Sequence, residues 1–249
     1  MPKFFISQEQ IDGNNLKIKG KDVNHIRNVL RKKINDEITV CNIDNQKDYL
    51  CTINELEKEY INCTIVTELE KNVESNVKLT ILQGLPKADK MELIIQKSVE
   101  LGVTEIIPIE MKRCVVKLQE KDKIKKVQRW QKISEVASKQ CGRNIIPKIG
   151  QVMSLKNICN LIDNYDIVLV AYENEKEKSI KQILKEIKNN YSKEIKIAVL
   201  IGPEGGISLE EIEALTESGA MTMSLGKRIL RTETVTLNVA SIIMYELDE

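Results

Sequence analysis

The sequence predicts two parts: a small β-barrel in residues 1–72, and an α/β domain with a mainly parallel sheet in residues 73–249. Three observations support this fold class. Short β-rich runs separated by turn residues fill the first part, with one helical segment among them. From about residue 77, strand-like and helical segments alternate, as they do in parallel α/β folds. The later strand-like segments are continuous apolar runs, which is typical of strands covered on both faces.

Composition limits the class of protein. The 38 lysines and arginines nearly balance the 37 acidic residues, so any surface for a polyanion must be local. The six cysteines contain no C-x-x-C pair and the chain has one histidine, so we expect no metal site. No apolar stretch approaches the length of a membrane span or a signal peptide. We therefore expect a cytoplasmic protein with reduced cysteines, and no membrane association.

In the first part, a helix is predicted over residues 21–33, because Val23, Ile26, Val29 and Leu30 recur at helical spacing. Turn residues such as Asp12-Gly13-Asn14 separate the runs around it, and residues 70–77 form a polar connector. The predicted strands are residues 3–7, 15–20, 36–44, 49–54 and 60–69.

In the second part, five apolar runs each precede an amphipathic segment, and Gly102 marks the end of the first helix. The predicted strands are residues 77–85, 103–111, 166–172, 195–202 and 220–226. The predicted helices are residues 88–102, 122–140, 175–190, 208–219 and 232–247.

The stretch "LIGPEGGIS", residues 200–208, is a glycine-rich loop between a strand and a helix. It has neither the Gly-Lys-Ser/Thr ending nor the G-x-G-x-x-G spacing of phosphate-binding loops. Ser208 and Glu211 form a predicted capping box, and the acidic first turn would repel a phosphate. Gly205 and Gly206 then indicate either a ligand lying on exposed main chain or simply a tight turn.

A second loop, in "SLGKRILRTETVTLNVAS" (residues 224–241), also lies between a strand and a helix. Its apolar Ile229 and Leu230 either fold back on the core or flank a ligand. Both loops lie at the carboxyl ends of parallel strands, where open α/β sheets bind ligands. S-adenosyl-L-methionine suits such a site, because it carries no phosphate and its cationic sulfonium would not be repelled by Glu204.

Several segments resemble the RsmE family, the SPOUT-class methyltransferases of small-subunit ribosomal RNA. They are "LIGPEGGIS", "SLGKRILRTET", "LPKADKMELIIQKSVELGVTEIIPI", "QCGRNIIPKI" and, at residues 25–31, "HIRNVLR"; the match runs from residue 3 to about 247. The resemblance implies a PUA-like RNA-binding barrel, a SPOUT domain with a deep trefoil knot, and a homodimer with the cofactor site near the interface. It also implies methyl transfer from S-adenosyl-L-methionine to N3 of a specific uridine in 16S rRNA, with the assembled small ribosomal subunit as the expected substrate.

Carried over by position, the resemblance predicts both groups of binding residues. The cofactor-binding residues are Leu200, Gly202, Pro203, Glu204, Gly205, Gly206, Leu225, Gly226, Ile229, Leu230 and Thr232. The predicted RNA-binding residues are His25, Arg27, Arg31, Arg113 and Gln140, with a structural role as the alternative for His25. Two departures from the family pattern stand out: Lys139 replaces a glutamate, which puts an acid–base role there in doubt, and Val235 replaces an alanine.

Residues 110–150 concentrate positive charge, with twelve basic against four acidic side chains. Such an excess favours phosphate contact, although a solvated helix face is the alternative. Trp130 either stacks on a base or belongs to the core. The basic residues are Lys112, Arg113, Lys117, Lys121, Lys123, Lys125, Lys126, Arg129, Lys132, Lys139, Arg143 and Lys148.

For the chemistry, N3 of uridine is a base-pairing atom, so the base must be unpaired or flipped out. We expect Arg231 to stabilise the negative charge that develops on the uracil, with Arg143 as the second catalytic candidate. Main-chain carbonyls, Glu204 or water are the alternatives for accepting the proton. Rival functions are a nucleotide-dependent oxidoreductase, which the absence of G-x-G-x-x-G after the first α/β strand disfavours, a non-catalytic RNA-binding factor, and methylation of another target such as transfer RNA ribose.

Overall fold

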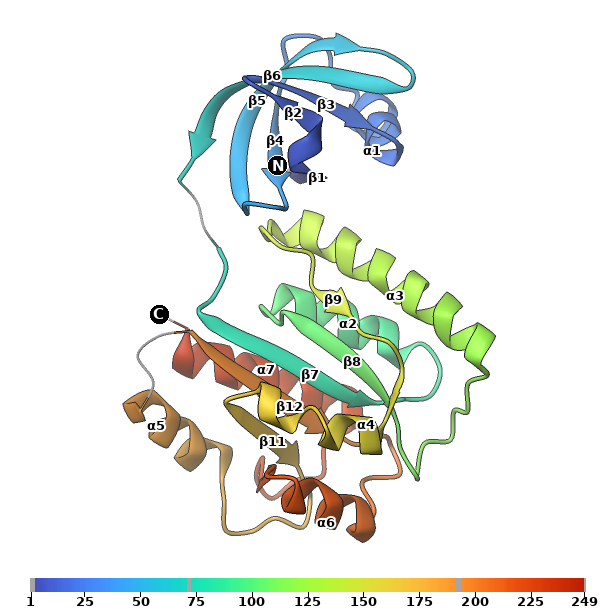
Figure 1. Ribbon diagram of the computed structural model, residues 1–249, viewed down its shortest axis with the longest axis vertical. Helices are drawn as coiled ribbons and strands as arrows, with labels where there is room; N and C mark the ends of the chain where they lie inside the picture. The colour runs from blue at the N-terminus through green and yellow to red at the C-terminus, as the bar shows by residue number, and fades with distance from the viewer. Residues whose placement is uncertain (1–2, 71–72, 191–193, 249) are drawn as a thin grey trace. The chain divides into compact units, whose positions relative to one another are not determined.

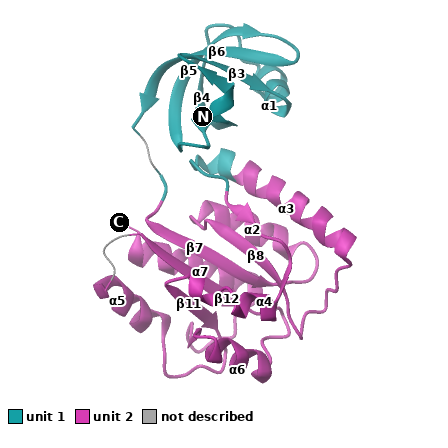
Figure 2. Cartoon of the chain, in the orientation of Figure 1, with its two compact units in different colours: residues 1–74, 138–146 teal, residues 75–137, 147–249 magenta. Residues whose placement is uncertain are grey.

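The computed structural model describes residues 3–70, 73–190 and 194–248. The chain forms two compact units (Figure 2). The first comprises Met1–Glu74 with Ser138–Ile146, and the second comprises Ser75–Ala137 with Pro147–Glu249. The expected boundary between residues 72 and 73 adjoins residues 71–72, which lie outside the described ranges. No sequence pattern predicted that the segment Ser138–Ile146 belongs with the N-terminal unit.

The first unit is a curled six-stranded sheet in the order β1-β4-β5-β6-β3-β2 (Figure 1). Its neighbours pair antiparallel except β1 with β4, and irregularities in the β5–β6 register help the sheet to curl. Phe4, Val40 and Ile53 lie in its core. The strands are β1 (Lys3–Ile6), β2 (Ile11–Asp12), β3 (Asn15–Lys19), β4 (Glu37–Asn42), β5 (Lys47–Leu56) and β6 (Tyr60–Leu69).

The helix of the first unit is shorter than the sequence predicts. Helix α1 (Lys21–Asn24) continues as a single π-helical turn, His25–Val29, in which the Leu30 amide donates to the His25 carbonyl at 2.9 Å. Arg31 then adopts a φ of 53°, a left-handed conformation that a continuing helix cannot contain. The predicted extension to residue 33 is therefore wrong. A short 3₁₀ turn, Gln8–Gln10, lies before β2.

The second unit contains a parallel sheet in the order β10-β8-β7-β12-β11-β13, with β9 paired to β8. Every pair in it is parallel, which confirms the predicted sheet type. Strand β12 lies between β7 and β11, so the carboxyl ends of these three strands are neighbours. The strands are β7 (Val77–Gly84), β8 (Glu105–Glu110), β9 (Lys148–Ile149), β10 (Met153–Ser154), β11 (Ile167–Ala171), β12 (Ile195–Ile201) and β13 (Met221–Met223).

Helices pack around this sheet: α7 contacts β7, β12, α2 and α5, while α4 packs against α6 (Figure 1). The short elements β2, β9, β10 and α4 were not predicted, because they are too short to show a period. None of the helices in the described ranges is long and apolar enough to span a bilayer. The helices are α2 (Lys90–Glu100), α3 (Glu120–Cys141), α4 (Leu155–Cys159), α5 (Ile180–Asn190), α6 (Leu209–Glu217) and α7 (Thr232–Leu247), with a 3₁₀ turn at Ile162–Asn164.

The structure tests two local predictions, on Trp130 and on the capping box at Ser208. Trp130 is only 4% exposed and packs with the sheet residues, so it is a core residue and not a stacking platform. At the start of α6, the Ser208 hydroxyl accepts from the Glu211 amide at 3.4 Å. The Glu211 carboxylate accepts from the Ser208 amide at 3.0 Å. The predicted capping box is confirmed.

Candidate active site

A cavity of about 450 Å³ lies at the carboxyl ends of the central strands of the second unit. It is lined by the loop after β12, the loop after β13 and the first residues after β11, together with Lys90 of α2 and Val235 of α7. Its volume is within the usual range for small-molecule sites, and its place is the one expected for ligands of open parallel sheets.

Ten of the eleven predicted cofactor-binding residues line this cavity. Leu200 is the exception: its side chain is completely buried in β12, whereas the next residue, Ile201, reaches the cavity. Successive strand residues point to opposite faces, which explains the difference. The residues that the structure brings together are Gly202, Pro203, Glu204, Gly205, Gly206, Leu225, Gly226, Ile229, Leu230 and Thr232.

The first loop needs glycines, because there is no room for side chains. A Cβ on Gly202 would lie 2.7 Å from Cγ1 of Ile207, and one on Gly205 would lie 2.9 Å from the carbonyl oxygen of Arg113. The Arg113 guanidinium also donates to the Gly205 carbonyl at 3.1 Å. Arg113, predicted as an RNA contact, thus packs on this loop. The glycines leave the main chain itself open to the cavity.

A buried polar network pins the same loop to the sheet and to α7. The Thr232 hydroxyl donates to the Gly202 carbonyl at 2.7 Å and accepts from the Gln83 side-chain amide at 2.9 Å. The hydroxyl of Thr236 donates to the Gln83 carbonyl oxygen at 2.6 Å. Satisfied networks of this kind rigidify a site. Gln83 was missed from the sequence because it stands inside an apolar strand and its partners lie about 150 residues away.

A second, more exposed contact fixes Glu204. Its carboxylate pairs with Lys90 at 2.9 Å and accepts from the Lys87 amide at 3.1 Å, while Lys90 also pairs with Glu233 at 3.1 Å. Burial alone would raise the pKa of Glu204, but the hydrogen bonds from Lys90 and main-chain amides outweigh it, so the pKa is lowered. Glu204 therefore stays ionised and is a poor proton acceptor.

The second loop presents apolar and cationic groups to the cavity. Ile229 is 90% exposed, which contradicts the alternative that it folds back on the core. Arg231 is the N-cap residue of α7 and is exposed, and it lines the cavity together with Arg228. Arg228 and Arg231 form no ion pair or hydrogen bond with other residues that the structure describes, so both guanidinium groups are available to a ligand or substrate.

Glu173 is a cavity residue that the sequence reasoning missed. It follows β11, the third strand whose carboxyl end opens here, and its Oε1 would lie 2.9 Å from a Cβ placed on Gly206. It forms no hydrogen bond or ion pair with other residues that the structure describes. The rule that ligands bind at strand carboxyl ends could have found it, because it comes directly after the apolar run 166–172.

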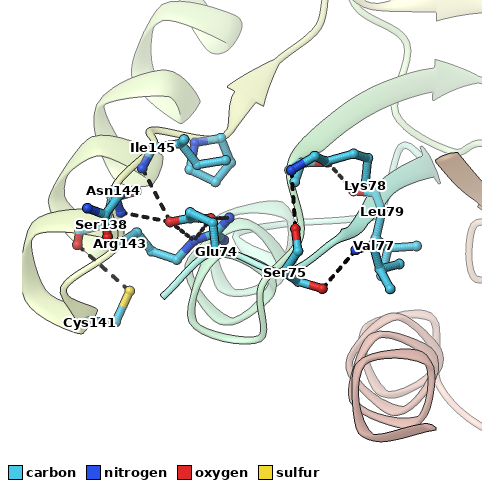
Figure 3. A network of polar contacts seen from close by, with 12 residues as sticks. Glu74, Ser75, Val77, Lys78, Leu79, Ser138, Cys141, Arg143, Asn144 and Ile145 are labelled. Carbon is cyan, nitrogen blue, oxygen red and sulfur yellow. Dashed lines mark hydrogen bonds and ion pairs between the residues drawn. The ribbon is translucent and has the colours of Figure 1, made fainter. Parts of the chain in front are cut away.

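Arg143, the second catalytic candidate, is not among the cavity residues and belongs to the first unit. Its guanidinium is buried and binds Glu74 through Nε at 3.0 Å and Nη2 at 2.6 Å (Figure 3). The main-chain amides of Asn144 and Ile145 also donate to Glu74. Burial alone would raise the pKa of Glu74, but these contacts outweigh it and lower the pKa. This geometry supports a structural role for Arg143.

The other predicted RNA contacts lie in the first unit. His25 is half-buried and packs edge-on against Phe4, with ring centroids 5.9 Å apart, which favours its structural alternative. Arg27 is half-buried, and Arg31 and Gln140 are exposed. Lys139, which departs from the family pattern, pairs with Asp22 at 2.9 Å.

Comparison with known families defines the class of protein. Residues 73–244 match the family model of the RNA methyltransferase domain, and residues 18–66 match that of the RNA methyltransferase PUA domain. Fold and site together are thus those of an RNA methyltransferase with a PUA-like domain.

Full-length relatives narrow this class. The chain is 36% identical to "Ribosomal RNA small subunit methyltransferase E" of Bacillus subtilis, over 100% of this chain and 98% of that protein. The protein of the same name from Aquifex aeolicus is 32% identical over 96% of this chain and 98% of its own length. The chain belongs to the ribosomal RNA small subunit methyltransferase E family, which confirms the resemblance seen in the sequence motifs.

Solved structures agree. A ribosomal RNA small subunit methyltransferase E from Neisseria gonorrhoeae, bound to S-adenosyl methionine, superposes with a TM-score of 0.85 at 31% identity, covering 98% of this chain and 97% of that one. A putative methyltransferase from Legionella pneumophila, in complex with the bound cofactor SAM, gives 0.83 at 31% identity, covering 98% and 96%.

Proposed function

We propose that this protein transfers a methyl group from S-adenosyl-L-methionine to N3 of a specific uridine in 16S rRNA of the small ribosomal subunit. The observation that carries this proposal is the cavity built from two glycine-bearing loops, in a chain of this family. The names of the relatives and the cofactor in two similar structures support the substrate and the methyl donor.

The residues of the cavity fit that cofactor. Main-chain groups of Gly202, Gly205 and Gly226 would hold the adenosine, and Ile229 and Leu230 would wall it. The cation Lys90 is neutralised by two carboxylates, so it would not repel a cationic ligand. When bound, the cofactor supplies an electrophilic methyl group on a sulfonium.

The chain's own groups then act on the uracil. N3 loses its proton as it gains the methyl carbon, so negative charge develops on the base. Arg231 at the rim of the cavity would stabilise this charge. Two carboxylates line the cavity within the described ranges, and Glu204 is held ionised by Lys90. We therefore assign Glu173 as the group that accepts the N3 proton, which then passes from its carboxylate to water.

One experiment tests the reaction and its rivals. The protein is incubated with labelled S-adenosyl-L-methionine and small ribosomal subunits that lack the modification, and the labelled nucleoside is identified by mass spectrometry. We expect label on N3-methyluridine at one position. Label on ribose or on another base would reassign the target. The absence of label would favour a non-catalytic RNA-binding factor.

Three finer features belong to the same proposal: action on assembled small subunits in the cytoplasm, a homodimer, and a trefoil knot in the last strands. Tyr245 on α7 is 85% exposed, which supports an interface on that helix. The insertion of β12 between β7 and β11 is compatible with a threaded chain. Light scattering tests the dimer, a crystallographic chain trace tests the knot, and comparing free 16S rRNA with subunits tests the substrate.

A further inference from the structure

The basic side chains of residues 110–150 fall into two groups: those that form an ion pair or hydrogen bond with described residues, and those that do not. Six of the twelve form ion pairs: Lys112, Lys123, Arg129, Lys139, Arg143 and Lys148. Arg113 binds the Gly205 carbonyl. The other five are lysines that make no ion pair or hydrogen bond with residues the structure describes, although the ammonium of Lys126 lies over the Trp130 ring, 5.8 Å from its centroid. These five are Lys117, Lys121, Lys125, Lys126 and Lys132, and all are exposed.

Three of the free lysines lie on one line along α3. Lys121, Lys125 and Lys132 are four and seven residues apart, so an α-helix places them within about 40° of one another around its axis. The buried positions of the helix, Val127 and Trp130 among them, lie on the opposite side. We call these three exposed residues the lysine ridge.

The three lysines of the ridge form no ion pair with residues that the structure describes, so the ridge carries net positive charge. Two acidic residues of α3 flank the ridge: Asp122 is three residues before Lys125, and Glu135 is three residues after Lys132. The third, Glu120, is paired with Lys123. Like charges four residues apart on a helix repel each other and destabilise it. Binding of a polyanion would reverse this repulsion, because each lysine ammonium is a point charge suited to a phosphate.

We propose that the lysine ridge binds the phosphodiester backbone of the RNA substrate. This inference rests on the proposed function for the identity of the partner. The ridge extends for about 16 Å along the helix at 1.5 Å per residue, long enough to meet several phosphates of one strand. Phosphate contacts position a nucleic acid without reading its bases. The ridge therefore sets affinity for the RNA and not the choice of nucleotide.

The test removes the ridge charge and leaves the cavity intact. Lys121, Lys125 and Lys132 are changed together to Gln, and a matched control changes Lys176, Lys181 and Lys185, which are exposed lysines of the same unit without side-chain partners among the described residues. Binding to unmodified small ribosomal subunits is measured between 50 and 200 mM salt, concentrations over which phosphate contacts are strongly screened.

We expect the ridge variant to lower the slope of log affinity against log salt by about 2 to 3, since each lysine–phosphate contact contributes about 0.7 to 0.9. KM for the subunits should rise with kcat little changed, and the Kd for S-adenosyl-L-methionine should stay at the wild-type value. Substituting Arg at the three ridge positions should restore the slope, and the control variant should behave like wild type.

An unchanged salt slope in the ridge variant would overturn the inference, and so would an equal loss in the control variant, which would indicate an effect of net charge alone. Failure of the proposed function looks different. In that case the wild-type protein itself would not methylate the subunits, whatever the salt dependence of binding.

Discussion

Thr232 offers the sharpest test of how the first cofactor loop is held. Replacing Thr232 with Val keeps the shape of the side chain and removes its hydroxyl. The Gly202 carbonyl then loses its 2.7 Å donor, and the Gln83 amide loses a 2.9 Å acceptor but keeps the Gly84 carbonyl at 3.0 Å. Leaving one buried polar group unpaired costs about 1–3 kcal/mol.

This free-energy cost should appear in two measurements. The free energy of unfolding should fall by about 1–3 kcal/mol in denaturant titrations. If the loop is released to that extent, the Kd for S-adenosyl-L-methionine should rise by about 5- to 150-fold, measured by calorimetry. Thr216→Val is the matched control, because the Thr216 hydroxyl is exposed and binds only carbonyls of its own helix. A Thr232→Val protein with a Kd within twofold of wild type would show that the Thr232 hydroxyl does not hold the cofactor loop.

Three further substitutions test neighbouring parts of the account. Glu173→Gln should lower kcat by about 10²-fold or more, with a nearly unchanged Kd for the cofactor; an unchanged kcat would remove Glu173 as proton acceptor. Lys90→Met should weaken cofactor binding, with partial rescue by Arg. Because the pKa of Glu204 is lowered in the folded protein, its ion pair with Lys90 stabilises the loop above the ordinary carboxyl pKa and is lost as pH falls through the lowered value. Without Lys90, burial should raise that pKa, so cofactor binding measured against pH should fail at a higher pH than in wild type; coincident acid limbs would contradict this. Arg143→Met should destabilise the first unit by about 3–5 kcal/mol in denaturant titrations, because the ion pair is buried. Adding Glu74→Gln should recover part of the loss, whereas a stable single variant that cannot methylate would restore the catalytic role of Arg143.

The outline of the site could be predicted because it depends on local patterns. Strand periods placed the two glycine-bearing loops at the same edge of a parallel sheet, and the structure brings ten of their residues to one cavity. The spacing of Ser208 and Glu211 alone predicted the start of α6.

The supporting contacts could not be predicted, because they join residues far apart in the chain. In the sequence, Gln83 is only a polar residue inside an apolar strand. Its role is evident only from the structure, in which it hydrogen-bonds Thr232 and Thr236. In the sequence, Arg143 has no evident partner, because Glu74, to which it binds in the structure, lies 69 residues earlier. The left-handed conformation of Arg31, which ends the first helix early, could not be predicted either, because such a conformation is usually marked by a glycine.

The central claim is that two glycine-bearing loops of the second unit hold a sulfonium methyl donor beside Arg231. A crystal structure of the protein with S-adenosyl-L-methionine measures this directly. We expect the ligand in the cavity between residues 202–206 and 225–232, bound mainly by main-chain groups. Density for the ligand at any other place, or no uptake of it at saturating concentration, would contradict the account.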